Sequence, residues 1–208
     1  LVDMLVIQAE KILMCAQRPS EFQPPTGGAA QQPHYLDAAA LDRPTDACRL
    51  VMALLEEAGR AAREALDGGN LASLLLELGG RMHATWLNHM QQFTFSPAGA
   101  LRWRSDVAGY TSVLRGWAPP LLPPLEARMA SLAALCGVLL VEPEQLLPLV
   151  NGSLRLDHRE AIKYVRLRQD FSTARVQGRS LQQVFGGGDA VPGGQQAGGG
   201  GGGGGGRR

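Results

Sequence analysis

The stretch from Leu71 to Phe93 contains no proline, and its large apolar side chains recur in steps of three and four residues. Such spacing keeps side chains on one face of an α-helix, where they can pack against neighbouring helices. Polar residues such as Glu77 and Arg81 fall on the opposite side, as a solvent-exposed face requires. The sequence therefore predicts a long amphipathic helix with a core stripe formed by Leu71, Leu75, Leu78, Met82, Trp86, His89 and Phe93.

A second helical pattern follows from Gly99 to Trp117, after a break at Ser96-Pro97. Proline lacks an amide donor and disfavours helical dihedral angles in the residue before it, so the first helix must end ahead of it. Because the connection is short, we expect the two helices to pack antiparallel. Leu and Ala dominate the composition and aromatic residues are few, which favours an all-α fold of packed helices.

Composition divides the chain into four parts. Residues 1–17 are expected to form the end of a preceding helix, and residues 18–43, rich in Pro, Gly and Gln, a flexible loop. Residues 44–180 are expected to form a C-terminal helical bundle. Residues 181–208 are expected to form a disordered Gly-rich tail, because glycine loses the most backbone entropy on folding. We infer that the chain is the C-terminal piece of a longer protein.

Two further expectations concern the ends of the predicted bundle. After the helix-start signal around Thr45, the apolar pattern places Leu50 on the inner face of the first helix. Near the C-terminus, Asp157 is positioned to cap a last helix that continues to Val176.

The apolar run from Met129 to Val141 falls short of the roughly 20 residues that a membrane span needs, so it is predicted to be a core helix.

Net charge and cysteine usage bear on the kind of partner and on the redox compartment of the protein. The formal net charge is +1, so the overall electrostatics give no reason to expect a nucleic-acid partner. Cys15, Cys48 and Cys136 are widely spaced and form no CxxC pair, which predicts three buried free thiols in a reducing, cytoplasmic compartment.

No catalytic, cofactor-binding or metal-binding residues emerge from the motifs. His83 and His89 are six residues apart, whereas two metal ligands on one helix are three or four residues apart. His89 lies on the apolar stripe and is expected to be buried with a hydrogen-bond partner. The sequence contains no Gly-x-Ser-x-Gly, His-Glu-x-x-His or phosphate-binding loop, so we predict a protein that is not an enzyme and has no cofactor.

Three basic residues of the expected last helix, Arg159, Lys163 and Arg166, follow one another at spacings of four and three. This basic face suits an anionic membrane surface or an acidic partner such as a small GTPase. It also suits a simple solvated face, which an i, i+4 pair of Arg166 with Asp170 would support. The spacing leaves both interpretations open.

Four blocks occur in order along the chain: DRPTDAC (Asp42–Cys48), LELGGRMHATWLNHMQQFTF (Leu76–Phe95), PAGALRWR (Pro97–Arg104) and YVRLRQDFSTAR (Tyr164–Arg175). The ordered set resembles the C-terminal region of the Sec-ten family of exocyst subunits. The resemblance covers most of residues 42–176, and the Pro/Gly/Gln-rich loop, the proline pairs after Trp117 and the glycine tail depart from it.

This resemblance implies a rod of consecutive antiparallel helical bundles, of the kind found in vesicle-tethering complexes. It implies a non-catalytic role in the exocyst, which tethers secretory vesicles to the plasma membrane during exocytosis. The implied partners are the other exocyst subunits, most closely the Sec-fifteen-type subunit. The implied location is cytoplasmic and peripheral, at the plasma membrane or on secretory vesicles. A helical module that binds a membrane or small GTPase through its basic face is the alternative.

Overall fold

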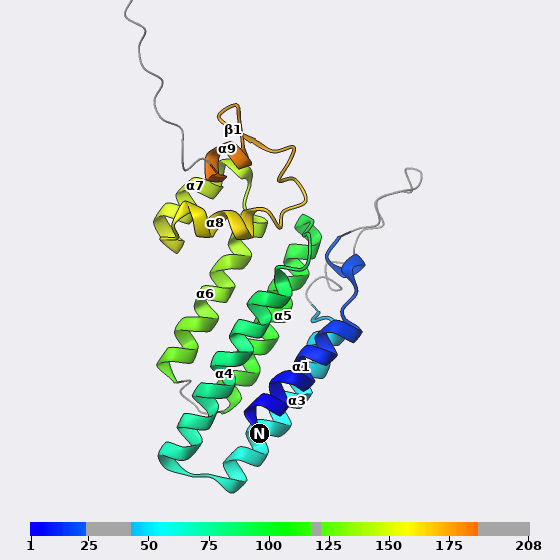
Figure 1. The fold of residues 1–208 in the computed structure, drawn as a ribbon, viewed down its shortest axis with the longest axis vertical. Coiled ribbons are helices and arrows are strands. Elements are labelled where there is room, and N and C mark those ends of the chain that lie inside the picture. The colour runs from blue at the N-terminus through cyan, green and yellow to red at the C-terminus, as the bar shows by residue number, and fades with distance from the viewer. Residues whose placement is uncertain (24–42, 118–121, 187–208) are drawn as a thin grey trace, which may run out of the picture.

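Five long helices lie side by side along the longest axis of the molecule (Figure 1). The computed structural model describes residues 1–23, 43–117 and 122–186. Within these residues the five helices confirm the all-α bundle that periodicity and composition predict. They are α1 (Val2–Ala16), α3 (Asp46–Ala65), α4 (Gly68–Met90), α5 (Pro97–Trp117) and α6 (Pro123–Leu140).

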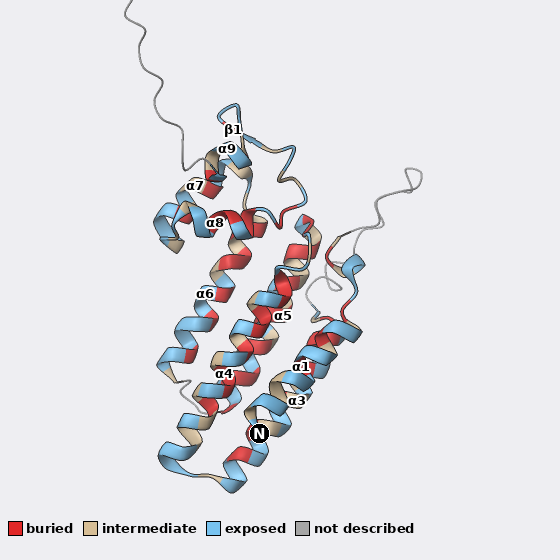
Figure 2. Cartoon of the chain, in the orientation of Figure 1, coloured by how far each residue is buried: buried red, intermediate tan, exposed pale blue. Residues whose placement is uncertain are grey.

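The bundle is held together by one continuous hydrophobic core. Helix α5 packs against α3 and α6, while α1 packs against α3 and α4, and α4 also contacts α6. Figure 2 shows buried residues on the inner sides of these helices and exposed residues on their outer sides. Residues 1–17, predicted to end a preceding helix, therefore belong to the bundle, because Ala9 and Leu13 are buried in the same core.

The predicted stripe of α4 faces the core. Five of its members are buried, namely Leu75, Leu78, Met82, Trp86 and His89. Leu71 lies near the start of α4, whereas Phe93 lies three residues after its last residue, Met90; both are partly buried against the same core. Opposite them, Glu77, Arg81, Asn88 and Gln91 are exposed.

The connection into α5 depends on a close backbone contact with the segment after α1. Ser96 caps α5, since its Oγ accepts a hydrogen bond from the amide of Gly99 at 3.1 Å. The Ser96 amide also donates to the carbonyl oxygen of Phe22 at 2.9 Å. A Cβ on Gly99 would lie 1.9 Å from that oxygen, so only glycine permits this approach.

A smaller C-terminal part covers one end of α6 and α5 (Figure 1). It contains η2 (Pro143–Gln145), α7 (Leu146–Pro148), the π-helical η3 (Leu149–Leu154), α8 (His158–Val165), an antiparallel pair of strands β1 (Arg175–Val176) and β2 (Arg179–Ser180), and α9 (Leu181–Gly186). A short 3-10 turn, η1 (Pro19–Glu21), follows α1 at the same end of the bundle (Figure 1).

The structure corrects the predicted last helix. It ends at Val165 rather than Val176, and the chain then turns back toward the bundle. Asp170 pairs with Arg168 and not with Arg166. The physical cause is a set of tertiary contacts, in which Arg168 donates to the carbonyl oxygens of Val138 in α6 and of Val141 just after it.

Three other expectations also need correction. Leu181 and Phe185 are buried in α9, so residues 181–186 belong to the folded part rather than to a tail. Cys15 is exposed, whereas Cys48 and Cys136 are buried as predicted. Leu50 is exposed, because Ala47, Val51 and Leu55 form the inner face of α3.

Most of the predicted loop (24–42) and tail (187–208), with residues 118–121, lies outside the described residues.

Helix α6 is long and apolar enough to cross a membrane by length and composition alone. In the structure it packs against α4, α5, η3 and α8, and it buries Leu125, Met129, Leu132, Leu135, Cys136, Val138 and Leu139. This packing agrees with the prediction that the apolar segment is a core helix.

Candidate functional site

The joint between the bundle and the C-terminal part centres on Arg168. Its side chain is only 7% exposed. Nη1 donates to the carbonyl oxygens of Val138 at 2.9 Å and Val141 at 2.7 Å, near the C-terminal end of α6. Nε and Nη2 both donate to the carboxylate of Asp170 at 2.8 Å. The last carbonyls of a helix lack intrahelical partners, and a cation near them is favourable, so Arg168 completes the end of α6.

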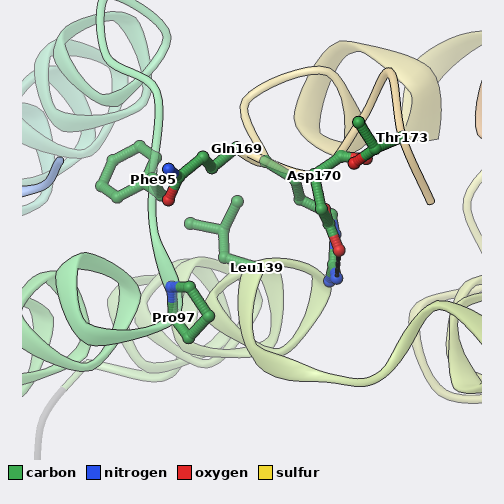
Figure 3. A pocket seen from close by; sticks show the side chains of 7 residues that line it. Phe95, Pro97, Leu139, Gln169, Asp170 and Thr173 are labelled. Carbon is green, nitrogen blue, oxygen red and sulfur yellow. Dashed lines mark hydrogen bonds and ion pairs between the residues drawn. The ribbon is translucent and has the colours of Figure 1, made fainter. Parts of the chain in front are cut away.

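A backbone bridge beside Arg168 ties this segment to the α4–α5 connection. The amide of Phe95 donates to the carbonyl of Leu167 at 2.7 Å, and the amide of Gln169 donates to the carbonyl of Phe95 at 2.8 Å. Figure 3 shows the pocket that results, with Phe95 and Pro97 on one side and Asp170 and Thr173 on the other. Its volume is about 370 Å³, and Leu139 and Gln169 also line it.

Two blocks of the ordered set converge at this joint. Phe95 ends the block LELGGRMHATWLNHMQQFTF, and Leu167 and Arg168 lie within YVRLRQDFSTAR. Because Arg168 uses its donors on protein acceptors, the pocket offers little cationic charge to a ligand. The arrangement therefore fixes the C-terminal part to the bundle.

A cluster of aromatic rings supports the joint from inside the bundle. The ring of Phe22 lies 5.0 Å from Phe95, 5.1 Å from Phe93 and 6.0 Å from Trp103, measured between ring centroids. Edge-on and tilted rings at these separations contribute favourable energy beyond the area they bury. The cluster thus links the segment after α1, the end of α4 and the start of α5.

Asp106 is a fully buried carboxylate inside the bundle. It accepts hydrogen bonds from the amide and the hydroxyl of Thr45, at 2.7 and 2.9 Å. Thr45 in turn caps α3 by accepting from the amide of Cys48 at 3.1 Å. Burial raises the pKa of Asp106 to about 7, although the hydrogen bonds from Thr45 oppose the shift.

The groups around Asp106 are not arranged as a nucleophile and base. Burial, reinforced by the nearby Asp106 charge, raises the pKa of Cys48 far above its usual range, so its thiol stays protonated. Within residues 1–23, 43–117 and 122–186, no three His, Cys, Asp or Glu side chains gather to hold a metal ion. Asp106 therefore joins the start of α3 to α5 and leaves no access for a substrate.

His89 is buried as predicted, but among the described residues its Nε2 lacks the expected hydrogen-bond partner. Burial lowers its pKa to about 4, so the imidazole is neutral in the folded protein at physiological pH. Its ring packs edge-on against Phe93, with a centroid separation of 4.8 Å. His89 thus acts as a core residue.

The three residues of the predicted basic face are all exposed. Arg159 and Lys163 lie on α8, and Arg166 follows at its C-terminal end. Among the ion pairs of the described residues, none involves these three side chains. The face is available to a partner, but the structure holds no group that identifies one.

A second exposed face, which the sequence reasoning missed, lies on the outer side of α1. Met4, Ile7 and Met14 are 68%, 58% and 75% exposed. The spacing of these three residues is visible in the sequence. The opposite stripe, which contains the buried Ala9 and Leu13, is by itself enough to predict an amphipathic helix, so the outer residues were not singled out. Near the start of α1, an apolar groove of about 430 Å³ opens between α1, α3 and α4, with Leu1, Leu54 and Leu74 among its lining residues.

The family described as "Exocyst complex component Sec10-like, alpha-helical bundle" matches residues 1–179. The chain belongs to the Sec10 family. A relative from Oryza sativa, Exocyst complex component 5, is 33% identical over 175 residues, which cover 84% of this chain and 20% of that protein. Exocyst complex component SEC10b of Arabidopsis thaliana is 28% identical over the same share of each chain.

Animal members of the Sec10 family are similarly related. Exocyst complex component 5 of Homo sapiens is 28% identical over 177 residues, which cover 84% of this chain and 23% of that protein. The chain thus spans about a fifth of the length of the curated relatives that it matches. The family resemblance inferred from the four ordered blocks is confirmed.

Proposed function

We propose that the chain is the helical-bundle part of a non-catalytic exocyst subunit that tethers secretory vesicles to the plasma membrane before fusion. The match of the Sec10 helical bundle to residues 1–179 carries this proposal. The names of the relatives, all exocyst components, point the same way.

The chemistry of the interior supports a scaffold rather than an enzyme. The Cys48 thiol is held protonated, and His89 is held neutral in the core. Asp106 joins the start of α3 to α5 through Thr45, and Arg168 joins the segment after α8 to the end of α6. The expected action is mechanical, in that a rigid bundle holds partner proteins at fixed positions.

The proposed partners are the other exocyst subunits, and the Sec-fifteen-type subunit is the closest of them. The proposed location is the cytoplasm, with peripheral attachment at the plasma membrane or on secretory vesicles.

Depletion of the parent protein in its own cells tests this role. Secretory vesicles should then gather beneath the plasma membrane, and re-expression of the full-length protein should clear them. Re-expression without residues 43–186 should not. Normal vesicle numbers after complete depletion would contradict the proposal.

The basic face supports a second candidate, in which the same module contacts an anionic membrane or a small GTPase. The supporting observation is the exposure of Arg159, Lys163 and Arg166 without an ion pair in the described part of the chain. Binding to vesicles that contain 20% phosphatidylserine should fall when all three become Glu, with helicity unchanged. If binding is absent, or is unchanged by the three substitutions, the basic residues form only a solvated face.

A further inference from the structure

A network of buried polar side chains joins the end of α1 to the start of α3, two helices that lie side by side in Figure 1. Gln17 follows α1 and Thr45 precedes α3; they are 7% and 1% exposed, and Asp106 on α5 is fully buried. The Thr45 Oγ1 atom lies 3.4 Å from Gln17 Oε1 and 2.9 Å from Asp106 Oδ2. Gln17 Nε2 in turn donates to the carboxylate of Glu21. The network therefore runs from η1 through the end of α1 and the start of α3 to α5.

A single hydrogen atom decides how this network is connected. A hydroxyl group has one hydrogen to donate and two lone pairs that accept. One lone pair of Thr45 Oγ1 accepts from the amide of Cys48 at 3.1 Å, so one remains. Gln17 Oε1 and Asp106 Oδ2 both lie within reach of the hydroxyl, but its one hydrogen can serve only one of them. Which oxygen receives it depends on whether Asp106 carries a proton.

The two protonation states of Asp106 connect the helices differently. An ionised carboxylate only accepts, so the amide and the hydroxyl of Thr45 both donate to it, and Gln17 Oε1 receives no hydrogen from Thr45. A protonated Asp106 instead donates from Oδ2 to the second lone pair of Thr45 Oγ1. The hydroxyl hydrogen of Thr45 then points to Gln17 Oε1, and the bond between the end of α1 and the start of α3 is complete.

The surroundings of Asp106 favour the protonated state. Among the ion pairs of the described residues, none involves Asp106. Burial and the like charge of Glu21 raise the pKa of Asp106 to about 7. The other titratable neighbours are Cys48 on α3, Tyr110 on α5 and Cys136 on α6. Burial raises the pKa of each of them, so they are uncharged at neutral pH and supply no cation.

We propose that Asp106 is a pH-sensitive latch, which fastens the end of α1 to the start of α3 when it is protonated and releases it when it is ionised. On ionisation the proton passes to solvent, and the Thr45 hydroxyl turns from Gln17 to Asp106. The interior then holds a charge without a counter-ion, and local opening exposes that charge to water. The inference goes beyond the proposed function, since the latch operates whichever assembly contains the chain.

Hydrogen exchange of the purified full-length parent protein tests the latch. Amide exchange is followed in residues 13–22 and 45–52, and each rate is divided by the intrinsic chemical rate at that pH. Asp106→Asn mimics the protonated acid, because its amide group can both donate to and accept from Thr45. Relative to this variant, exchange in the two segments of the wild type should rise about tenfold from pH 6 to pH 8. Glu56→Gln, which removes a carboxylate at an exposed position of α3, should behave as the wild type.

Low concentrations of urea distinguish local opening from unfolding of the whole bundle. Local opening exposes little surface, so exchange in the two segments should be independent of urea up to about 1 M, whereas exchange in α4 should accelerate. Exchange that rises with urea as steeply as in α4 would overturn the proposal. So would an Asp106→Asn variant that keeps the pH dependence of the wild type.

Gln17→Met provides a test that does not require the Asp106 variant. It removes the acceptor on the end of α1, so exchange in the two segments should accelerate about fivefold at pH 6. The effect should be much smaller at pH 8, where the Thr45 hydroxyl of the wild type already donates to Asp106. The bond from Gln17 to Glu21 is lost at both pH values, so the difference isolates the bond to Thr45. An equal acceleration at pH 6 and pH 8 would contradict the latch.

Discussion

The indole ring of Trp86 lies flat against the ring of Tyr110, with centroids 4.2 Å apart and an interplanar angle of 12°. Both side chains are fully buried, and the stack joins α4 to α5 at the centre of the bundle. Aromatic side chains bury a large apolar area, and stacked rings add favourable energy beyond it, so this pair is expected to stabilise the bundle.

Trp86→Ala should therefore destabilise the chain by about 3–5 kcal/mol, because it removes the stack and leaves a cavity in a close-packed core. Urea denaturation of the purified chain measures the change. Gln92→Ala, at an exposed position just after α4, should change the free energy of unfolding by less than about 0.5 kcal/mol. Equal midpoints for the Trp86 variant and the wild type would show that the stack is absent.

Asp106 should make the stability of the chain depend on pH. Its pKa is raised from 3.8 to about 7, so the folded protein holds the proton more tightly than the unfolded chain. The stabilisation is complete below about pH 4 and is lost as the pH rises through 7. Asp106→Asn keeps an oxygen for Thr45 but does not titrate. The difference in unfolding free energy between variant and wild type should therefore shift in favour of the variant from pH 5 to pH 8. An equal difference at both values would contradict the burial of the charge.

His89 should contribute the opposite slope. Its pKa is lowered from 6.5 to about 4, so the unfolded chain binds the proton more tightly between these values. The stability that the neutral ring confers is present above pH 6.5 and is lost as the pH falls toward 4. The unfolding free energy of His89→Leu, relative to that of the wild type, should therefore be higher at pH 5 than at pH 8. An equal difference at the two pH values would contradict the burial of the neutral ring.

Arg168→Met should loosen the C-terminal part while leaving the bundle folded. The change removes the bonds to Val138, Val141 and Asp170, and it leaves carbonyls at the end of α6 without their partner. Amide hydrogen exchange should accelerate by at least about tenfold in residues 158–186, and far less in α3 and α5. Arg179→Met, at an exposed position of β2, should leave the pattern unchanged. Uniform acceleration across all helices would show that the two parts unfold together.

Gly99→Ala and Gly116→Ala form a matched pair on α5. A Cβ at residue 99 would meet the carbonyl oxygen of Phe22 at 1.9 Å, whereas a Cβ at residue 116 meets nothing within 4 Å. We expect the first change to cost about 1–3 kcal/mol. The second should be neutral or stabilising by up to about 1 kcal/mol, because alanine favours the helix. Thermal melting of both variants checks the order, and a stable Gly99 variant would mean that the segment after α1 does not contact α5.

Periodicity predicted those parts of the structure in which local pattern and burial agree. The stripe from Leu75 to His89 is such a case, since steps of three and four can bury these side chains only on a helix. The helix start at Thr45 is another, because its side chain caps the backbone amide of Cys48. Each of these features depends on residues within a few positions of one another.

The joint around Arg168 could not be predicted in this way. The segment after Val165 contains good helix formers, but the acceptors for Arg168 lie on α6, about 30 positions earlier in the chain. Tertiary contacts therefore override the local preference. Asp106 was open to prediction, since it lies three residues after Trp103 and four before Tyr110 on the buried face of α5. A charged residue on an apolar stripe is a signal of a buried polar contact.

The central claim is that the parent protein is part of the exocyst. Affinity purification of the full-length parent protein from its own cells tests this claim most directly. Mass spectrometry of the purified material should recover the other exocyst subunits at similar abundance to the parent. Their absence, from cells in which the complex is otherwise intact, would contradict the account.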